Sequence, residues 1–140
     1  MLSVGPRGNQ NVHYPNGGAM NFQEQLDKAI GAHGLWKARL RTAIDTGKSD
    51  FNPHTVKTDN NCDFGKWLYN DISPELKTSP TYKVVLQYHA EFHKEAGRIL
   101  QLALEGNKED AEKGIKAAST FATISSSLTA TMMEWKKSLK

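Results

Sequence analysis

Residues 79–107 read SPTYKVVLQYHAEFHKEAGRILQLALEGN, and their first and last residues carry the start and stop signals of a helix. The leading serine can cap a helix whose first turn accepts Pro80, and Gly106 can end that helix. Apolar side chains recur every three or four residues between these signals and form one face of an amphipathic helix: Tyr82, Val85, Leu86, Phe92, Ala96, Leu100, Ala103 and Leu104. The stretch therefore predicts a long helix with one buried face, on which His89 and His93 also lie.

The chain on both sides of this stretch shows the same periodicity. Asn21 and Glu24 have the spacing of a capping box and begin a helix that Gly47 can end. A short second helix is predicted from about 59–61 to 71, and a last long helix from about 108 toward 138. No alternating stretch competes as a strand. We therefore predict an all-α fold, an antiparallel four-helix bundle with an additional short helix and a flexible N-terminal arm.

Residues 1–20 differ in composition from the remainder of the chain. They hold four of the eleven glycines and two of the five prolines, and they carry no acidic residue. We expect a flexible arm here, with His13 solvated in it. Residues 21–140 are predicted to form one domain.

The overall composition excludes several classes of protein. Eighteen basic and fifteen acidic residues leave a net charge of +3, which is too small and too scattered to indicate a nucleic-acid partner. No stretch approaches the roughly 20 apolar residues of a membrane span. The start of the chain lacks the apolar core of a signal peptide, so we expect a cytoplasmic location.

Three histidines and the single cysteine form the candidate site. His89 and His93 are four residues apart on a helix, so both imidazoles leave the same face and can reach one metal ion. His33 has a similar place on the apolar face of the first helix. Cys62 falls at the start of the short helix, where the helix dipole favours the thiolate. These are the ligands that Zn²⁺ prefers, and four of them form a closed tetrahedral site with no position for a substrate.

Other residues near this site have plainer roles. Gly65 is one turn after Cys62, where the lack of a side chain allows another segment to approach closely. Asp59 either caps the short helix or accepts a hydrogen bond from a ligand histidine. His54 is expected to be a loop residue. The tryptophans and Tyr69 are expected to belong to the core.

Three motifs of this chain resemble the bacterial chemoreceptor zinc-binding (CZB) domain family. They are His-x-x-Trp at 33–36, CDFGKWLY at 62–69, and Pro-x-Tyr at 80–82 followed by His-x-x-x-His at 89–93. The resemblance covers about residues 26–100. It implies a helical bundle that binds one zinc ion through His33, Cys62, His89 and His93. Members of this family look like sensory modules attached to chemoreceptors or diguanylate cyclases, and they respond to zinc or to oxidants at the zinc-bound thiolate. A signalling partner of that kind is therefore expected.

Other functions compete with this interpretation. A zinc peptidase needs a glutamate directly after its first histidine, but Glu91 lies two residues after His89, on the opposite side of the helix. A hemerythrin-like di-iron protein needs bridging carboxylates, whereas Lys37 follows His33 by one turn. A cysteine hydrolase needs an oxyanion hole that no motif supplies. A metal-free interaction bundle stays open as an alternative. We predict a sensory module and not an enzyme.

The last predicted helix contains a long stretch without charge. Residues 117–133, AASTFATISSSLTATMM, hold no ionisable side chain. One face can serve the core and comprises Ala118, Phe121, Ile124, Leu128, Met132 and Trp135. The other face, with Thr120, Thr123, Ser127 and Ala130, would be uncharged and exposed in a monomer. We therefore predict a homodimer through the last helix.

Overall fold

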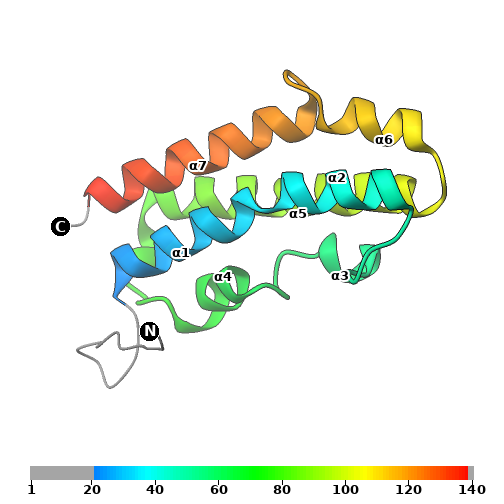
Figure 1. The fold of residues 1–140 in the computed structure, drawn as a ribbon. Helices are drawn as coiled ribbons and strands as arrows, with labels where there is room; N and C mark the ends of the chain where they lie inside the picture. The colour runs from blue at the N-terminus through cyan, green and yellow to red at the C-terminus, as the bar shows by residue number, and fades with distance from the viewer. Residues whose placement is uncertain (1–20, 139–140) are drawn as a thin grey trace, which may run out of the picture.

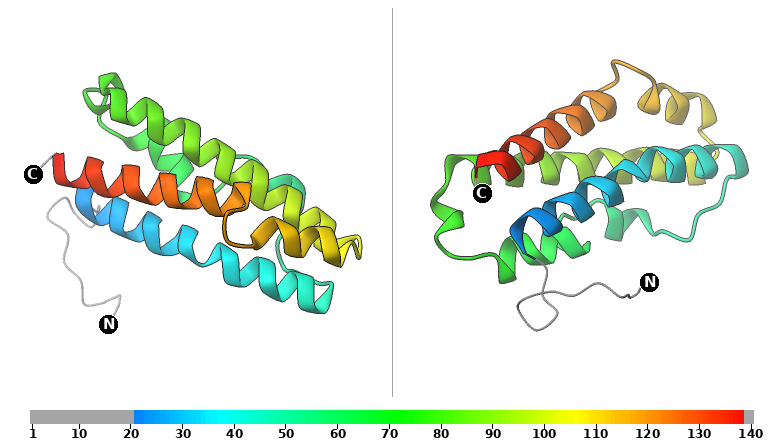
Figure 2. Two further views of the ribbon diagram at one scale, coloured as in Figure 1. Left: turned by 90° about the horizontal axis from the view of Figure 1, so that it is seen from above. Right: turned by 60° about the vertical axis from the view of Figure 1, so that its left-hand side comes forward.

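The structure is a computed structural model that describes residues 21–138, and these residues form helices and no strand. The chain makes four antiparallel passes (Figures 1 and 2). Helices α1 and α2 form the first pass, the short helices α3 and α4 lie on the second, α5 is the third, and α6 and α7 form the fourth. The all-α antiparallel bundle is confirmed, with short helices in its second pass. The predicted arm at residues 1–20 lies outside the described residues.

The first pass consists of α1 (Phe22–Gly34) and α2 (Trp36–Thr46). Its start is the predicted capping box, because the Asn21 side chain accepts a hydrogen bond from the Glu24 N–H and the Glu24 carboxylate accepts one from the Asn21 N–H. Its end is also as predicted, since Gly47 adopts φ 73°, which glycine adopts at little cost. The single helix that we predicted is interrupted at Leu35. Glycines at 31 and 34 weaken the helix just before this point.

The second pass differs most from the prediction. A four-residue helix, α3 (Pro53–Val56), occupies the expected loop. The predicted short helix begins at α4 (Asp63–Lys66) and continues as one π-helical turn, η1 (Trp67–Asp71). A 3₁₀ turn, η2 (Leu76–Thr78), leads into the third pass.

Helix α5 (Pro80–Leu104) is the centre of the bundle and agrees with its prediction. The Ser79 hydroxyl accepts the Thr81 N–H at 3.1 Å, Pro80 occupies the first turn, and Gly106 follows the helix with φ 83°. The other passes and the second-pass helix α3 pack against it. Its inward face is fully buried at Val85, His89, Phe92, Ala96, Ile99 and Leu100.

The fourth pass is two helices, α6 (Lys108–Ile115) and α7 (Thr120–Ser138), and the prediction of one helix was wrong. Ala118 lies in the break with φ 69°, so it is exposed and does not belong to the core face of α7. The break separates α6, which packs on α2, from α7, which packs on α1 (Figure 1). The interruptions of the first and fourth passes face each other across a cavity of about 190 Å³ that Gly34 and Ile115 both line.

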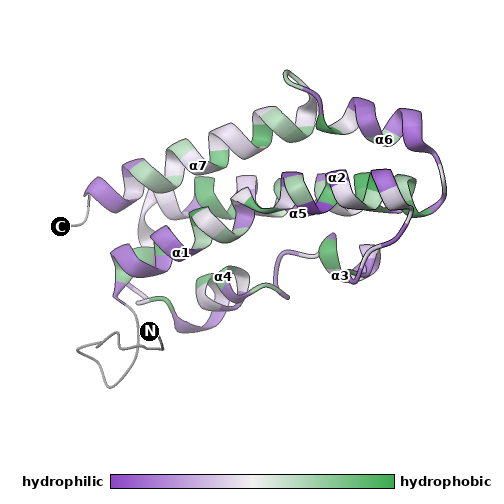
Figure 3. Cartoon of the chain, viewed as in Figure 1, coloured by the Kyte–Doolittle hydropathy of each residue, from purple (hydrophilic) through white to green (hydrophobic). Residues whose placement is uncertain are grey.

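No helix within the described range 21–138 combines the length and the apolar character needed to cross a bilayer. The hydropathy colouring shows α6 as largely hydrophilic, whereas α7 stays pale over most of its length and becomes hydrophilic at its C-terminal end (Figure 3). The core face of α7 buries Phe121, Leu128, Met132 and Trp135 as predicted, with Ile124 partly buried.

Candidate metal centre

The structure brings the four predicted ligand residues together. His33 is in the last turn of α1, Cys62 directly precedes α4, and His89 and His93 are one turn apart on α5. Their ligand atoms all lie within 4.8 Å of one another. The three Nε2 atoms are 3.1–3.2 Å apart, and the Cys62 Sγ lies 3.3–3.8 Å from them.

These separations match the edges of a zinc tetrahedron. With Zn–N of about 2.05 Å and Zn–S of about 2.3 Å, tetrahedral geometry places two nitrogens about 3.3 Å apart and a nitrogen about 3.6 Å from the sulfur. The observed N–N distances of 3.1–3.2 Å are slightly shorter than the first value, and the N–S distances of 3.3–3.8 Å lie on both sides of the second. One zinc ion would therefore contact all four ligand atoms without rearrangement of the backbone.

Two of the imidazoles are oriented by main-chain carbonyls. The His33 Nδ1 donates to the Ala29 oxygen at 2.8 Å, and the His93 Nδ1 donates to the Val56 oxygen at 2.9 Å. Since each ring then carries its proton on Nδ1, both Nε2 atoms are acceptors. Two acceptors 3.2 Å apart cannot hydrogen-bond to each other. A metal cation between them would satisfy both lone pairs, so the residues present fit zinc.

The imidazoles are held in the neutral form that binds a metal. Burial lowers the pKa of His33 to about 4, although its bond to the Ala29 carbonyl acts in the opposite direction. Burial, reinforced by the two neighbouring histidines, lowers the pKa of His89 to about 2. Burial also lowers the pKa of His93. All three rings are therefore neutral at pH 7, and none of them has to lose a proton before it can bind zinc.

The cysteine agrees only in part with its prediction. Cys62 is the N-cap of α4, and its Sγ accepts the Gly65 N–H at 3.3 Å, so its place at a helix start is confirmed. This bond lowers the pKa of the thiol, but burial has the larger effect and raises it. The helix start therefore favours the thiolate as predicted, but burial outweighs this effect and the net shift of the pKa is upward in the metal-free protein. Zinc has to displace the thiol proton when it binds.

Gly65 has the role that its position suggested. A Cβ atom on this residue would lie 1.8 Å from the Asp59 carbonyl oxygen. The absence of a side chain thus lets the 59–60 segment pass directly over α4, next to the ligand sulfur. Asp59 itself accepts the Tyr69 hydroxyl at 2.5 Å and acts on His93 only through its charge, which raises the pKa of that ring. Its predicted roles as a cap or as a partner of a ligand histidine were therefore wrong.

The remaining residues that the sequence singled out lie apart from the ligands. His54 is exposed, on α3 and not in a loop. Trp36 is buried in the core, and Trp67 is partly buried against it, as expected. Tyr69 is 41% exposed, so its assignment to the core was wrong. No sequence signal pointed to the carbonyls of Ala29 and Val56, because every residue carries such a group.

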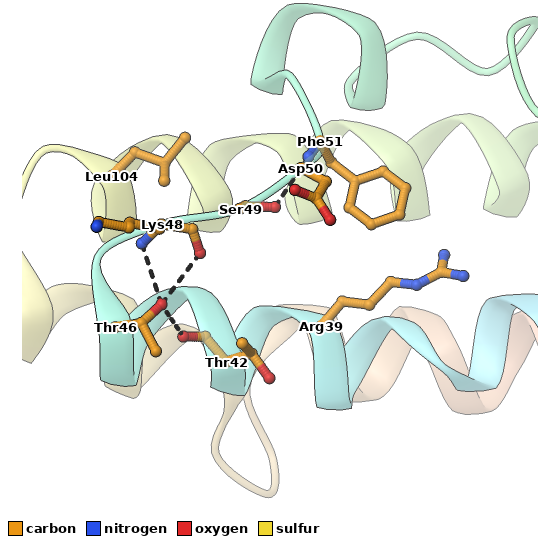
Figure 4. Close-up of a pocket in the computed structure, with 8 residues that line it drawn as sticks. All are labelled: Arg39, Thr42, Thr46, Lys48, Ser49, Asp50, Phe51 and Leu104. Atoms are coloured by element: carbon orange, nitrogen blue, oxygen red, sulfur yellow. Dashed lines mark hydrogen bonds between the residues drawn. The ribbon is translucent and has the colours of Figure 1, made fainter.

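A larger cavity of about 770 Å³ lies at the far end of α2 (Figure 4). Two of its three hydroxyl groups, those of Thr46 and Ser49, already have main-chain partners. The Thr46 hydroxyl donates to the Thr42 carbonyl at 2.8 Å and accepts the Lys48 N–H at 3.1 Å, and the Ser49 hydroxyl accepts the Phe51 N–H. This cavity contains none of the four ligand residues, and its size does not make it the functional site.

A helical bundle whose buried centre offers three neutral imidazoles and one thiol to a single point is a metal-binding domain. Residues 33–100 match the family described as the chemoreceptor zinc-binding domain, which supports the resemblance that the sequence motifs indicated. The match spans just under half of the chain and includes all four ligand candidates. Zinc is accordingly the cofactor of this domain, which is of the chemoreceptor type. Comparisons with curated proteins and with solved structures gave no match.

Proposed function

We propose that this protein is a sensory zinc module in which His33, Cys62, His89 and His93 are the ligands. The observation that supports it most is the contact of the bare His33 and His93 Nε2 atoms 3.2 Å apart beside one sulfur, because a cation stabilises two facing acceptors and a hydrogen bond between them cannot form. Four protein ligands complete a tetrahedral shell and leave no position for a substrate. This closed shell favours sensing over catalysis.

The ligand set is tested by substitution and metal analysis. Wild-type protein should bind one zinc ion per chain, and His89→Ala should weaken binding at least about a hundredfold, because the shell loses one of its four donors. His54→Ala removes a histidine that lies outside the cluster and should leave the affinity unchanged. The set would be wrong if His54→Ala lowered the affinity as much as His89→Ala.

We further propose that the zinc-bound sulfur is the point at which oxidants act. Hypochlorous acid transfers chlorine to the sulfur and releases hydroxide, and water then replaces the chloride to give sulfenic acid. The loss of the thiolate charge weakens the zinc–sulfur bond. Cys62 is the only cysteine in the chain, so no other thiol can be this sensor.

Oxidant titration should therefore release zinc. A zinc-sensitive dye should report release in step with the oxidation of Cys62, which mass spectrometry follows. Cys62→Ser, which binds more weakly, should show no further oxidant-dependent release. Full retention of zinc by protein whose Cys62 is oxidised would exclude the redox role and leave zinc itself as the cue.

The module is proposed to act in bacterial chemotaxis or in cyclic-di-GMP signalling, in the cytoplasm, through a chemoreceptor or a diguanylate cyclase. The family match supports the chemoreceptor type of partner. A second contact is proposed between two copies of α7. Thr120, Thr123 and Ala130 are exposed on this helix, and Met133 is 48% exposed on the same side. An uncharged exposed face of this length suits a two-fold homodimer.

The dimer has a direct test on the exposed face of α7. Ala130→Glu should shift the protein from dimer to monomer in light scattering at high micromolar concentration, because two like charges would meet across the two-fold axis. Ser127 is partly buried, so a substitution there would also disturb the core. Zinc content should not change. A wild-type protein that is monomeric under these conditions contradicts the dimer.

A further inference from the structure

A cavity of about 240 Å³ borders the metal centre on the side of Cys62, whereas the cavity of about 190 Å³ between the two interruptions borders His33 but not Cys62. The cavity beside Cys62 is lined by residues of α1 and of the segment that leads into α4, and it touches two of the four ligand residues, His33 and Cys62. Its inner wall consists of the buried residues Ala29, His33 and Phe64. Its rim consists of exposed residues, Lys28 and Ala32 from α1 together with Asn61 and Asp63.

The ligands differ in how well solvent reaches them. His89, His93 and His33 are 0%, 3% and 7% exposed, whereas Cys62 is only partly buried. Because this cavity borders Cys62, a molecule that enters it meets the sulfur before it meets His89 or His93. The cavity thus gives access to the atom at which oxidants are proposed to act.

Opposite charges face each other at the rim. The Lys28 ammonium lies 3.8 Å from the Asp63 carboxylate, and both side chains are more than half exposed. Such an exposed pair contributes little to stability, so its charges can be changed without unfolding the protein. The charges of Lys28 and Asp63 lie at the entrance of the cavity that borders Cys62, so they attract or repel a charged molecule that approaches the sulfur.

We propose that this cavity is the port through which zinc and thiol-directed reagents reach the metal centre, and that the balance of the Lys28 and Asp63 charges at its rim sets which charged molecules enter. The part of this proposal that concerns zinc rests on the proposed function, since it requires the four residues to bind the metal. Access to the thiol is a separate property that zinc-free protein also shows.

The charge selection is tested with three methanethiosulfonates: an anionic sulfonatoethyl reagent, a cationic trimethylammonioethyl reagent and a neutral methyl reagent. In each case the Cys62 sulfur, after loss of its proton to solvent, attacks the reagent's sulfenyl sulfur. A disulfide forms, and methanesulfinate leaves with the electron pair of the broken S–S bond. The ratio of the anionic to the cationic rate cancels changes in the reactivity of the thiol itself.

Lys28→Glu should lower this ratio about tenfold at low salt, and less at high salt, because the rim then carries two negative charges. Lys57→Glu is the matched control, since Lys57 borders the groove between α3 and α5 on another side of the centre. It should leave the ratio within about twofold. The port would be refuted if the Lys57 variant changed the ratio and the Lys28 variant did not.

A second variant tests the route without changing any charge. Ala32→Trp adds a large side chain at the rim and should slow the neutral reagent, and the transfer of zinc to a chelator, at least about tenfold. Ala38→Trp makes the same change at an exposed site of α2 that does not line this cavity and should have no effect. Unchanged rates in a folded Ala32→Trp protein overturn the port. Normal labelling ratios in a protein that binds no zinc would instead contradict the proposed function alone.

Discussion

Removal of zinc at pH 7 should lower the free energy of unfolding by about 5 kcal/mol. A metal that binds only the folded state stabilises it by mass action, and free zinc at ten thousand times its dissociation constant gives about this value. The ligands come from α1, the start of α4 and α5, so an unfolded chain does not present them together. The zinc-free protein should still fold, because the bundle has an extensive apolar core of its own.

Urea unfolding with zinc and with a chelator measures this difference. His54→Ala should retain it in full. His89→Ala should reduce it strongly, and the remaining value reports how well three ligands hold the metal. Equal unfolding free energies with and without zinc in the wild type would show that the metal does not connect these segments.

Acid should destabilise the zinc-free protein by about 4 kcal/mol between pH 6.5 and pH 4.5. Burial lowers the pKa of His33 to about 4 and that of His89 to about 2 in the folded state, whereas an unfolded histidine titrates near 6.5. Below pH 6.5 the unfolded chain therefore takes up protons that the folded chain does not. Each ring lowers stability by up to about 1.4 kcal/mol per pH unit, which gives about 2 kcal/mol each by pH 4.5.

Above pH 6.5 both states hold these rings neutral, so this contribution disappears there. Urea midpoints measured across the range in the presence of a chelator should show the loss. His33→Gln should remove about half of it, and His54→Gln, which changes an exposed histidine, should not alter it. An unfolding free energy that is independent of pH in this window would mean that the rings are already solvated in the zinc-free fold.

Helix starts and stops were predictable because their signals are local. The capping box at Asn21 and the glycine after α2 both act within one turn of the chain. The positions of the breaks at Leu35 and Ala118 were not predictable from such signals, although Gly31 and Gly34 weaken the helix before Leu35. The break at Ala118 lies where the fourth pass changes its partner from α2 to α1, and that change is a property of the packed bundle.

The four ligand candidates followed from residue type, helical spacing and the family motifs. The state of the cysteine did not, because the position of Cys62 at a helix start indicates a low pKa whereas its burial has the larger and opposite effect. Burial depends on which segments cover the sulfur. The close approach of the 59–60 segment to Gly65, one turn after Cys62, is likewise a property of the packed chain, and the sequence indicated only that Gly65 leaves space for a neighbouring segment.

The main-chain acceptors that orient His33 and His93 limit what a genetic screen of this domain can find. The oxygens of Ala29 and Val56 remain after any replacement of those side chains. An alanine scan would therefore detect the ligands and miss the groups that aim two of them. A backbone ester at the peptide bond that supplies either oxygen, made by chemical synthesis, weakens the acceptor and would reveal its contribution to the metal site.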